Sequence, residues 1–238
     1  MSAALDSLAR EPVATPSGGY SIVRLREILA SFYDRSTALA LALITADIGL
    51  FAAGEWLVAR GGSLWLELAG GALATVAIVR LFVIGHDACH ASLTDHATLN
   101  KVLGRIAFLP SLTPFSLWRV GHNVVHHGFN NLKGRDFVWE PLDPAEWQAL
   151  SPRRQLLERV YRSAFGPLPY YLVEIWWRRL YFPGKANAPG QRAEFFWDSL
   201  LVTVFVLGWA TVLVAAAGGS ASQMASALTL GLVMPFLV

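Results

Sequence analysis

Long apolar stretches constrain the fold of this chain more than any other feature of its sequence. Residues 38–58, 64–85 and 195–217 are each apolar over about the 20 positions that a helix needs to cross a membrane. Residues 224–238 begin a fourth stretch of the same kind. Charged residues make up only 15% of the sequence, whereas a soluble domain carries roughly 25%. We therefore expect an integral membrane protein.

Short glycine-containing links join these stretches in pairs. Arg60, Gly61 and Gly62 separate the first two stretches, and Gly218 and Gly219 separate the last two. Links this short predict two transmembrane helical hairpins. The fourth span is incomplete, because its apolar run ends after about 15 residues. The predicted fold class is thus all-α and integral to the membrane.

Charged side chains interrupt the predicted spans, and two of them have specific expectations. Asp47 occupies the middle of the first span, where a carboxylate is costly unless it faces a bundle interior or a cavity. We favour a simpler interpretation, in which Asp47 is a neutral, hydrogen-bonded packing residue. Arg80 lies within two turns of the end of the second span, so we expect its guanidinium to extend toward the lipid head groups.

Five of the six histidines fall into two clusters. The first cluster reads H-D-A-C-H over residues 86–90, and the second reads H-N-V-V-H-H over residues 122–127. In each cluster two histidines are four positions apart, and side chains with that spacing lie on one face of an α-helix. Neutral imidazole is the commonest metal ligand among side chains. The clusters predict a histidine-ligated metal centre with five candidate ligands: His86, His90, His122, His126 and His127.

The residue types narrow the choice of metal. Structural zinc is usually held by ligands that include thiolates, and Cys89 is the only cysteine. A haem uses one or two axial histidines and would leave most of the five unexplained. Copper and nickel stay open on ligand type alone. Two irons account for five histidines better than one ion does, and iron can activate O₂. The carboxylate-rich di-iron pattern, Glu-x-x-His, does not occur in the sequence.

The residues around the histidines carry a family resemblance. R-L-F-V-I-G-H-D-A-C-H begins at Arg80, and T-P-F-S-L-W-R-V-G-H-N-V-V-H-H begins at Thr113. Placed beside a membrane hairpin, these motifs resemble those of the membrane fatty acid desaturases, which belong to the histidine-box, non-haem di-iron superfamily. The resemblance covers residues 36–238 and is to the acyl-lipid desaturases of bacteria and plastids.

This resemblance implies a function. An enzyme of this family would use two non-haem iron ions, with O₂ as co-substrate, to insert a cis double bond into a lipid-linked or thioester-linked fatty acyl chain. The five histidines match the family's iron ligands. Electrons would come from a separate carrier, a ferredoxin or a b-type cytochrome, because the chain shows no fused haem domain and no cysteine cluster.

The family pattern also contains a third histidine box after the last two spans. No histidine follows His127 in this sequence, and the apolar run stops at Val238. We therefore expect a C-terminally truncated fragment that is inactive by itself. Two other functions stay open. One is another histidine-box membrane oxygenase, such as a carotenoid ketolase, a carotenoid hydroxylase or an alkane hydroxylase. The other is a non-enzymatic metal carrier or remnant.

Several residues near the histidines have less specific expectations. Asp87 either orients a ligand imidazole through its second nitrogen or is a solvated acid at a helix end. Trp118, Arg119 and Asn123 either shape the site or the acyl channel or are packing residues beside the second cluster, and we favour packing. Asp136 is expected to form a salt bridge within the following loop. His96 belongs to neither cluster and is expected to be an ordinary surface histidine.

The chain also divides by composition. Residues 1–35 are polar and predict a cytoplasmic N-terminal tail, with a helical apolar spacing over residues 20–33 that suits an amphipathic helix on the membrane surface. Residues 36–238 form the predicted membrane desaturase domain. Within it, residues 97–120 contain prolines and charges and are expected to be a re-entrant or interfacial segment rather than a span.

The distribution of Lys and Arg predicts orientation. These residues concentrate in the tail and in residues 130–194, whereas the two short turns contain Arg60 alone. The positive-inside rule then places both histidine clusters in a cap on the cytoplasmic side, and we expect a bacterial inner membrane. A formal net charge of +2, with no basic run interleaved with aromatics, argues against a nucleic-acid partner.

Overall fold

The computed structural model describes residues 21–30, 35–130, 132–183 and 192–233, and these residues form helices and turns without strands. The chain divides into two units, Met1–Arg35 and Ser36–Val238. The first unit contains α2 (Ile22–Ala30), which lies within the helix expected over residues 20–33. Residues 1–20 and 31–34 lie outside the described residues. The prediction of an all-α chain is thus confirmed for the part that is described.

The second unit contains three helices long and apolar enough to cross a membrane. They are α3 (Thr37–Arg60), α4 (Leu64–Cys89) and α11 (Arg192–Ala216). All three coincide with the apolar stretches of the sequence. The fourth stretch forms α12 (Ala221–Val233), and its residues 234–238 lie outside the described residues.

Helices α3 and α4 pack against each other along their lengths. Each begins with a serine cap, in which Ser36 Oγ accepts from the Leu39 N–H and Ser63 Oγ accepts from the Leu66 N–H. At Gly54 the two helix backbones lie so close together that a side chain would not fit. A Cβ atom added to Gly54 would lie 2.6 Å from the Ala74 backbone nitrogen. Small residues at such an interface let two helix backbones approach each other within the membrane.

A charged pair links the two helices inside this hairpin. The Arg80 Nε donates to Asp47 Oδ1 at 2.7 Å, and the Asp47 side chain is fully buried. Asp47 is therefore a hydrogen-bonded packing residue, as expected, and its partner is the Arg80 guanidinium. Arg80 correspondingly turns toward α3. Burying one charge beside its opposite offsets part of the desolvation cost that either would have alone.

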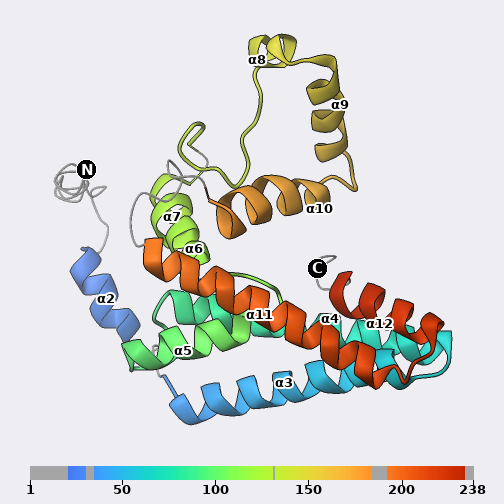
Figure 1. Ribbon diagram of the computed structural model, residues 1–238. Helices are drawn as coiled ribbons and strands as arrows, with labels where there is room; N and C mark the ends of the chain where they lie inside the picture. Colours follow the sequence, from blue (N-terminus) through green and yellow to red (C-terminus); the bar gives the residue numbers. More distant parts are fainter. Residues whose placement is uncertain (1–20, 31–34, 131, 184–191, 234–238) are drawn as a thin grey trace. The chain divides into compact units, whose positions relative to one another are not determined.

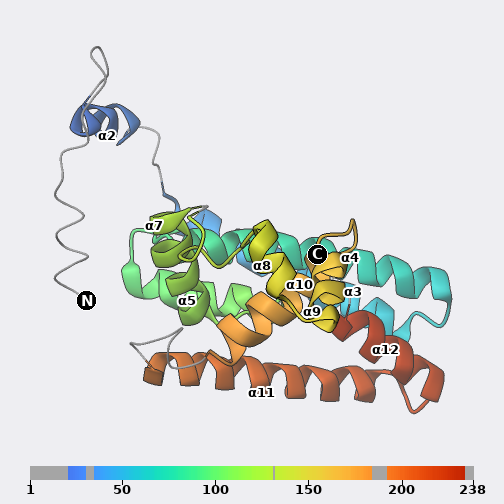
Figure 2. The ribbon, with the colours of Figure 1, turned by 90° about the horizontal axis from the view of Figure 1, so that it is seen from above.

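Helix α12 contacts α3, α4 and α11. Figure 1 shows α3 and α11 beginning at the same end of the unit, and Figure 2 shows α12 between α11 and the hairpin at the opposite end. The other described helices are α5 (Ala97–Phe108), α6 (Phe115–Arg119), η1 (Val120–His126), α7 (His127–Phe129), α8 (Pro144–Ala149), α9 (Pro152–Tyr161), α10 (Pro167–Tyr170) and η2 (Tyr171–Tyr181).

Residues 97–120, which we expected to be a broken segment, consist of two helices joined by a sharp turn. Helix α5 packs on α4, and the chain reverses before α6, with Leu112 at a φ of +52°. Phe108, Phe115 and Trp118 pack here into one buried aromatic cluster that also includes Ala88 and Cys89. This packing holds the start of the second histidine segment against the end of the first.

An ion-pair network fixes α11 to the same region. Arg105 Nε donates to Asp198 Oδ1 at 2.7 Å, and Arg105 Nη2 donates to Glu194 Oε1 at 2.8 Å. Asp198 Oδ2 also accepts from the Ser116 N–H at 2.8 Å, near the N-terminus of α6. The network therefore joins α5, α6 and α11 just before the second histidine cluster.

Candidate metal centre

The first two histidines lie on the last turn of α4. His86 and His90 are four positions apart, and their ring centroids are 4.6 Å apart, as expected for one helix face. The helix ends in a Schellman motif, in which the Ser92 N–H donates to Asp87 O and the Ala91 N–H donates to Ala88 O. Ala91 takes the left-handed position of this motif with a φ of +55°. The chain thus turns away directly after the second ligand.

The second cluster lies on a continuous helix that runs through α6, η1 and α7. Residues 120–126 form a π-helix rather than an α-helix, and the His127 N–H accordingly bonds to His122 O, five residues back. A π-turn holds one more residue than an α-turn, so positions five apart share a face. A π-turn therefore takes the place of the α-helical turn that we expected between His122 and His126. It is His127 that lies next to His122.

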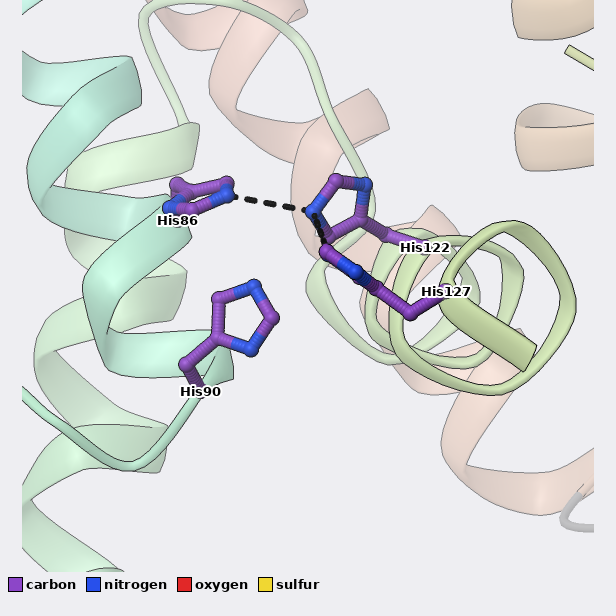
Figure 3. A group of neighbouring side chains, drawn as sticks. All are labelled: His86, His90, His122 and His127. Carbon is purple, nitrogen blue, oxygen red and sulfur yellow. Dashed lines mark hydrogen bonds between the residues drawn. The ribbon is translucent and has the colours of Figure 1, made fainter. Parts of the chain in front are cut away.

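Four imidazoles converge between these two helices, as Figure 3 shows. One nitrogen from each of His86, His90, His122 and His127 lies within 4.8 Å of the other three. The Nε2 atoms of His86 and His122 are 3.1 Å apart, and those of His122 and His127 are 3.0 Å apart. Nitrogens that share one metal at about 2.0–2.1 Å are roughly 3 to 4 Å from one another. The chemistry and spacing of this donor set fit a metal ion.

His126 occupies a different position from the other four. Its Nδ1 is 2.8 Å from Asp136 Oδ2, and the Asp136 side chain is 4% exposed. Its ring stacks on that of His122 with the centroids 5.6 Å apart. The sequence thus predicted five ligands, and the structure brings four of them together. His126 lies beside that group and stays a predicted ligand.

Carboxylates orient two of the imidazoles. Asp87 Oδ1 lies 3.2 Å from His86 Nδ1, and Asp136 contacts the Nδ1 atom of His126. A proton held on Nδ1 leaves Nε2 as the lone-pair donor, which is the usual arrangement for a metal-binding histidine. Asp87 contacts His86 and is half exposed, so its role as an orienting residue stays a prediction.

Trp118 forms one wall of the site. Its ring stacks on His122 with the centroids 4.1 Å apart and the planes inclined by 21°, and it contacts His86 edge to face. Phe82 and Phe108 each contact the indole ring of Trp118 edge to face. The aromatic ring therefore restricts the rotation of two candidate ligands.

The environment favours the neutral form of two imidazoles, those of His90 and His122. Burial, together with repulsion from the neighbouring imidazoles, chiefly His86 and His127, lowers the pKa of His122 to about 4. Burial likewise lowers the pKa of His90 from its ordinary value, and His86 and His127 again add to the effect. A neutral imidazole is the form that binds a metal ion.

An apolar cavity of about 470 Å³ borders the histidines. His122, His126 and Trp118 form its wall on one side, and Phe137, Tyr171 and Ile175 are among the residues that line it elsewhere. A second apolar cavity, of about 440 Å³, lies beside η2 and α11 and has no histidine among its lining residues. The first cavity is the one that reaches the candidate metal centre.

Two residues beside the histidines make contacts that the sequence did not specify. Asp136 contacts His126, and Trp118 contacts two histidines in addition to packing in the buried aromatic cluster. A buried acid ten residues after a histidine cluster carries no local signal of this contact. His96 is exposed at the start of α5 and lies outside the group of four, as expected.

Comparisons with known proteins identify relatives. The profile of the family described as "Fatty acid desaturase" matches residues 63–238. The sn-1 oleoyl-lipid 12-desaturase of Picosynechococcus sp. is 30% identical over 193 residues, which cover 76% of this chain and 52% of that protein. The chloroplastic omega-6 fatty acid desaturase of Arabidopsis thaliana is 29% identical over 183 residues, which cover 71% and 40%. The fatty acid desaturase of Bacillus subtilis is 32% identical over 115 residues, which cover 45% and 32%. The chain therefore spans between a third and about half of the length of these relatives.

Proposed function

The chain belongs to the fatty acid desaturase family, and on that premise we propose that it forms the metal-binding part of an oxygen-dependent fatty acyl desaturase. The single observation that carries this proposal is the convergence of His86, His90, His122 and His127 beside an apolar cavity. The substrate is a fatty acyl chain, linked to a lipid or to a thioester carrier. The product carries a new cis double bond.

The five histidines would hold two iron ions. His86, His90, His122 and His127 form the group that fits one ion, and His126 is the remaining candidate ligand for a second. Bound iron would supply the O₂ activation that attack on an unactivated C–H bond requires. The rest of the chemistry described here concerns what this chain's own side chains do.

Asp87 and Asp136 keep the ligand nitrogens available. Each carboxylate lies beside the Nδ1 atom of a histidine, which favours the tautomer that carries its proton on Nδ1 and its lone pair on Nε2. Trp118 stacks on His122 and limits its rotation. These contacts support a centre whose ligands are held in place before the metal binds.

The apolar cavity would bind the acyl chain. Its lining of aromatic and aliphatic residues excludes water from a chain that lies against His122 and His126. Holding one pair of methylenes beside the metal centre turns a reaction between separate molecules into a reaction within one complex. Electrons would come from an external ferredoxin or b-type cytochrome.

We further propose how the chain lies in the membrane. Helices α3 and α4 would form one transmembrane hairpin, and α11 and α12 the second. Residues 1–35 would be a cytoplasmic tail whose helix α2 lies on the bilayer surface, and residues 36–238 the membrane domain. The exposed apolar side chains of α2, among them Val23 and Leu29, support this position. The basic residues of the tail and of residues 130–194 support a cytoplasmic face for the histidines, in a bacterial inner membrane.

The test is a lipid analysis with a matched histidine control. The full-length protein that contains this sequence is expressed in a bacterial host that makes both membrane lipids and carotenoids, and fatty acid methyl esters are measured. We expect one additional unsaturated fatty acid from the wild type and from His96→Ala, because His96 lies outside the cluster. We expect none from His122→Ala.

Two outcomes would contradict the proposal. Oxygenated carotenoids without a new unsaturated fatty acid would assign the chain to another reaction of the histidine-box superfamily. The new fatty acid persisting in His122→Ala would remove the histidine cluster from the reaction.

A further inference from the structure

The two helices that carry the four imidazoles are joined by a side chain that is not a histidine. Asn123 Nδ2 donates to the carbonyl oxygen of Cys89 at 2.8 Å. Asn123 directly follows His122 in η1, and Cys89 directly precedes His90 in α4. The bond therefore joins the backbone beside His90 to the side chain beside His122.

This bond completes the end of α4. The last four carbonyl groups of an α-helix have no partner within the helix and must find one elsewhere. His86 O accepts from the His90 N–H, Asp87 O from the Ser92 N–H, and Ala88 O from the Ala91 N–H. The fourth carbonyl, that of Cys89, accepts from Asn123. Three of the last four carbonyl groups of α4 thus accept from nearby backbone N–H groups, and the fourth accepts from Asn123 in η1.

The orientation of the amide follows from the same contact. A carbonyl oxygen can only accept, so the NH₂ end of Asn123 must face Cys89. The other end, Oδ1, is buried and has no hydrogen-bond partner among the described residues. A buried acceptor without a partner is unfavourable, and an apolar side chain would avoid that cost. The amide, unlike an apolar side chain, forms the hydrogen bond to the Cys89 carbonyl.

We propose that Asn123 is a positioning residue of the metal centre: its amide sets the separation of α4 and η1 at which His86, His90, His122 and His127 converge. The inference rests on the proposed metal-binding function. Between the two helices that this bond joins, the His86 and His122 Nε2 atoms lie 3.1 Å apart. Residues that orient ligands in this way typically change metal affinity by about 10- to 100-fold when they are replaced.

The test compares two exchanges at Asn123 in the full-length protein. Asn123→Asp keeps the shape of the side chain but removes both N–H donors, whereas Asn123→Gln keeps the donors. Asn130→Asp, at an exposed helix end outside the cluster, is the matched control. Three quantities are measured: the affinity for Co²⁺ by competition with a chelator, the visible absorption of the Co²⁺ form, and the melting temperature of the metal-free protein.

We expect Asn123→Asp to bind Co²⁺ at least about tenfold more weakly than the wild type, with shifted absorption bands. We expect Asn123→Gln to recover part of the affinity and Asn130→Asp to match the wild type. The inference is overturned if Asn123→Asp binds Co²⁺ with wild-type affinity and spectrum. It is also overturned if Asn123→Asp and Asn123→Gln lose affinity equally and only in proportion to a lower melting temperature. A wild-type protein that binds no metal would instead refute the proposed function on which the inference rests.

Discussion

His122 and His127 face each other with their Nε2 atoms 3.0 Å apart, although they are five residues apart in the sequence. The π-helical turn between them is the reason, because it carries the extra residue that brings position i+5 onto the face of position i. Across from this pair, His86 and His90 use ordinary α-helical spacing. One regular helix end and one π-turn together build the four-histidine group.

The end of the first helix predicts a stabilising substitution. Ala91 adopts a φ of +55°, a conformation that costs an L-residue roughly 1–2 kcal/mol and costs glycine little. We expect Ala91→Gly to raise the free energy of unfolding by up to about 1 kcal/mol, measured by denaturation in detergent. Ala52→Gly, at an exposed helical position of α3, should lower it by about 1 kcal/mol. Easier unfolding of Ala91→Gly than of the wild type would contradict this interpretation of the helix end.

The ion-pair network of Arg105 predicts that its two acids, Asp198 and Glu194, contribute unequally to the free energy of unfolding. Asp198 is 4% exposed and satisfies both Arg105 and the Ser116 N–H. We expect Asp198→Ala to lower the free energy of unfolding by about 3 kcal/mol or more, because it leaves a buried donor and a partly buried charge with fewer partners. Glu194 is 30% exposed, so Glu194→Ala should cost less than about 1 kcal/mol. Thermal unfolding of the two variants checks this order, and equal losses would refute it.

The cavity predicts a position that controls the acyl chain. A Cβ atom at Gly121 would lie 3.0 Å from the ring of Phe137, and both residues line the cavity beside His122. We expect Gly121→Leu to lower desaturation of long acyl chains by about tenfold without lowering the iron content. Gly128→Leu is the control, since nothing lies within 4 Å of a Cβ at that glycine. An unchanged product distribution in Gly121→Leu would show that the acyl chain does not occupy this cavity.

Glu174 in helix η2 predicts a dependence of the stability on pH. Burial alone would raise the pKa of Glu174, but hydrogen bonds from Arg154 and Arg178 outweigh it, and the pKa lies below its ordinary value. A lowered carboxyl pKa stabilises the folded state above the ordinary pKa of about 4.3, and this stabilisation is lost as the pH falls through the folded-state pKa.

Removing this acid should therefore flatten the pH profile. We expect unfolding curves recorded from pH 6 to pH 3 to show a smaller loss of stability for Glu174→Gln than for the wild type. The comparison needs no activity, so it holds even for a chain that lacks bound metal. Identical slopes in the two proteins would show that Glu174 does not contribute to acid sensitivity.

The spans and the histidine clusters were predictable because their signals are local. Composition over about 20 residues identifies α3, α4 and α11, and four-residue spacing identifies the His86 and His90 pair. The glycine turns could be predicted for the same reason. Each of these features depends on neighbours in the sequence.

The features that were missed depend on contacts between distant residues. The π-turn leaves no mark in composition, so the sequence did not show that the Nε2 atoms of His122 and His127 would lie 3.0 Å apart. Arg80 pairs with Asp47 from 33 positions away. The cavity is lined by residues from three separate segments. None of these follows from the residue types in one stretch.

The most direct measurement of the central claim is the histidine-dependent iron content of the purified full-length protein. Iron per chain is determined after removal of loosely bound metal, for the wild type, His86→Ala and His96→Ala, at matched amounts of folded protein. The account predicts close to two irons in the wild type and in His96→Ala, and a loss of at least one in His86→Ala. Equal iron in all three proteins, or none in the wild type, would contradict it.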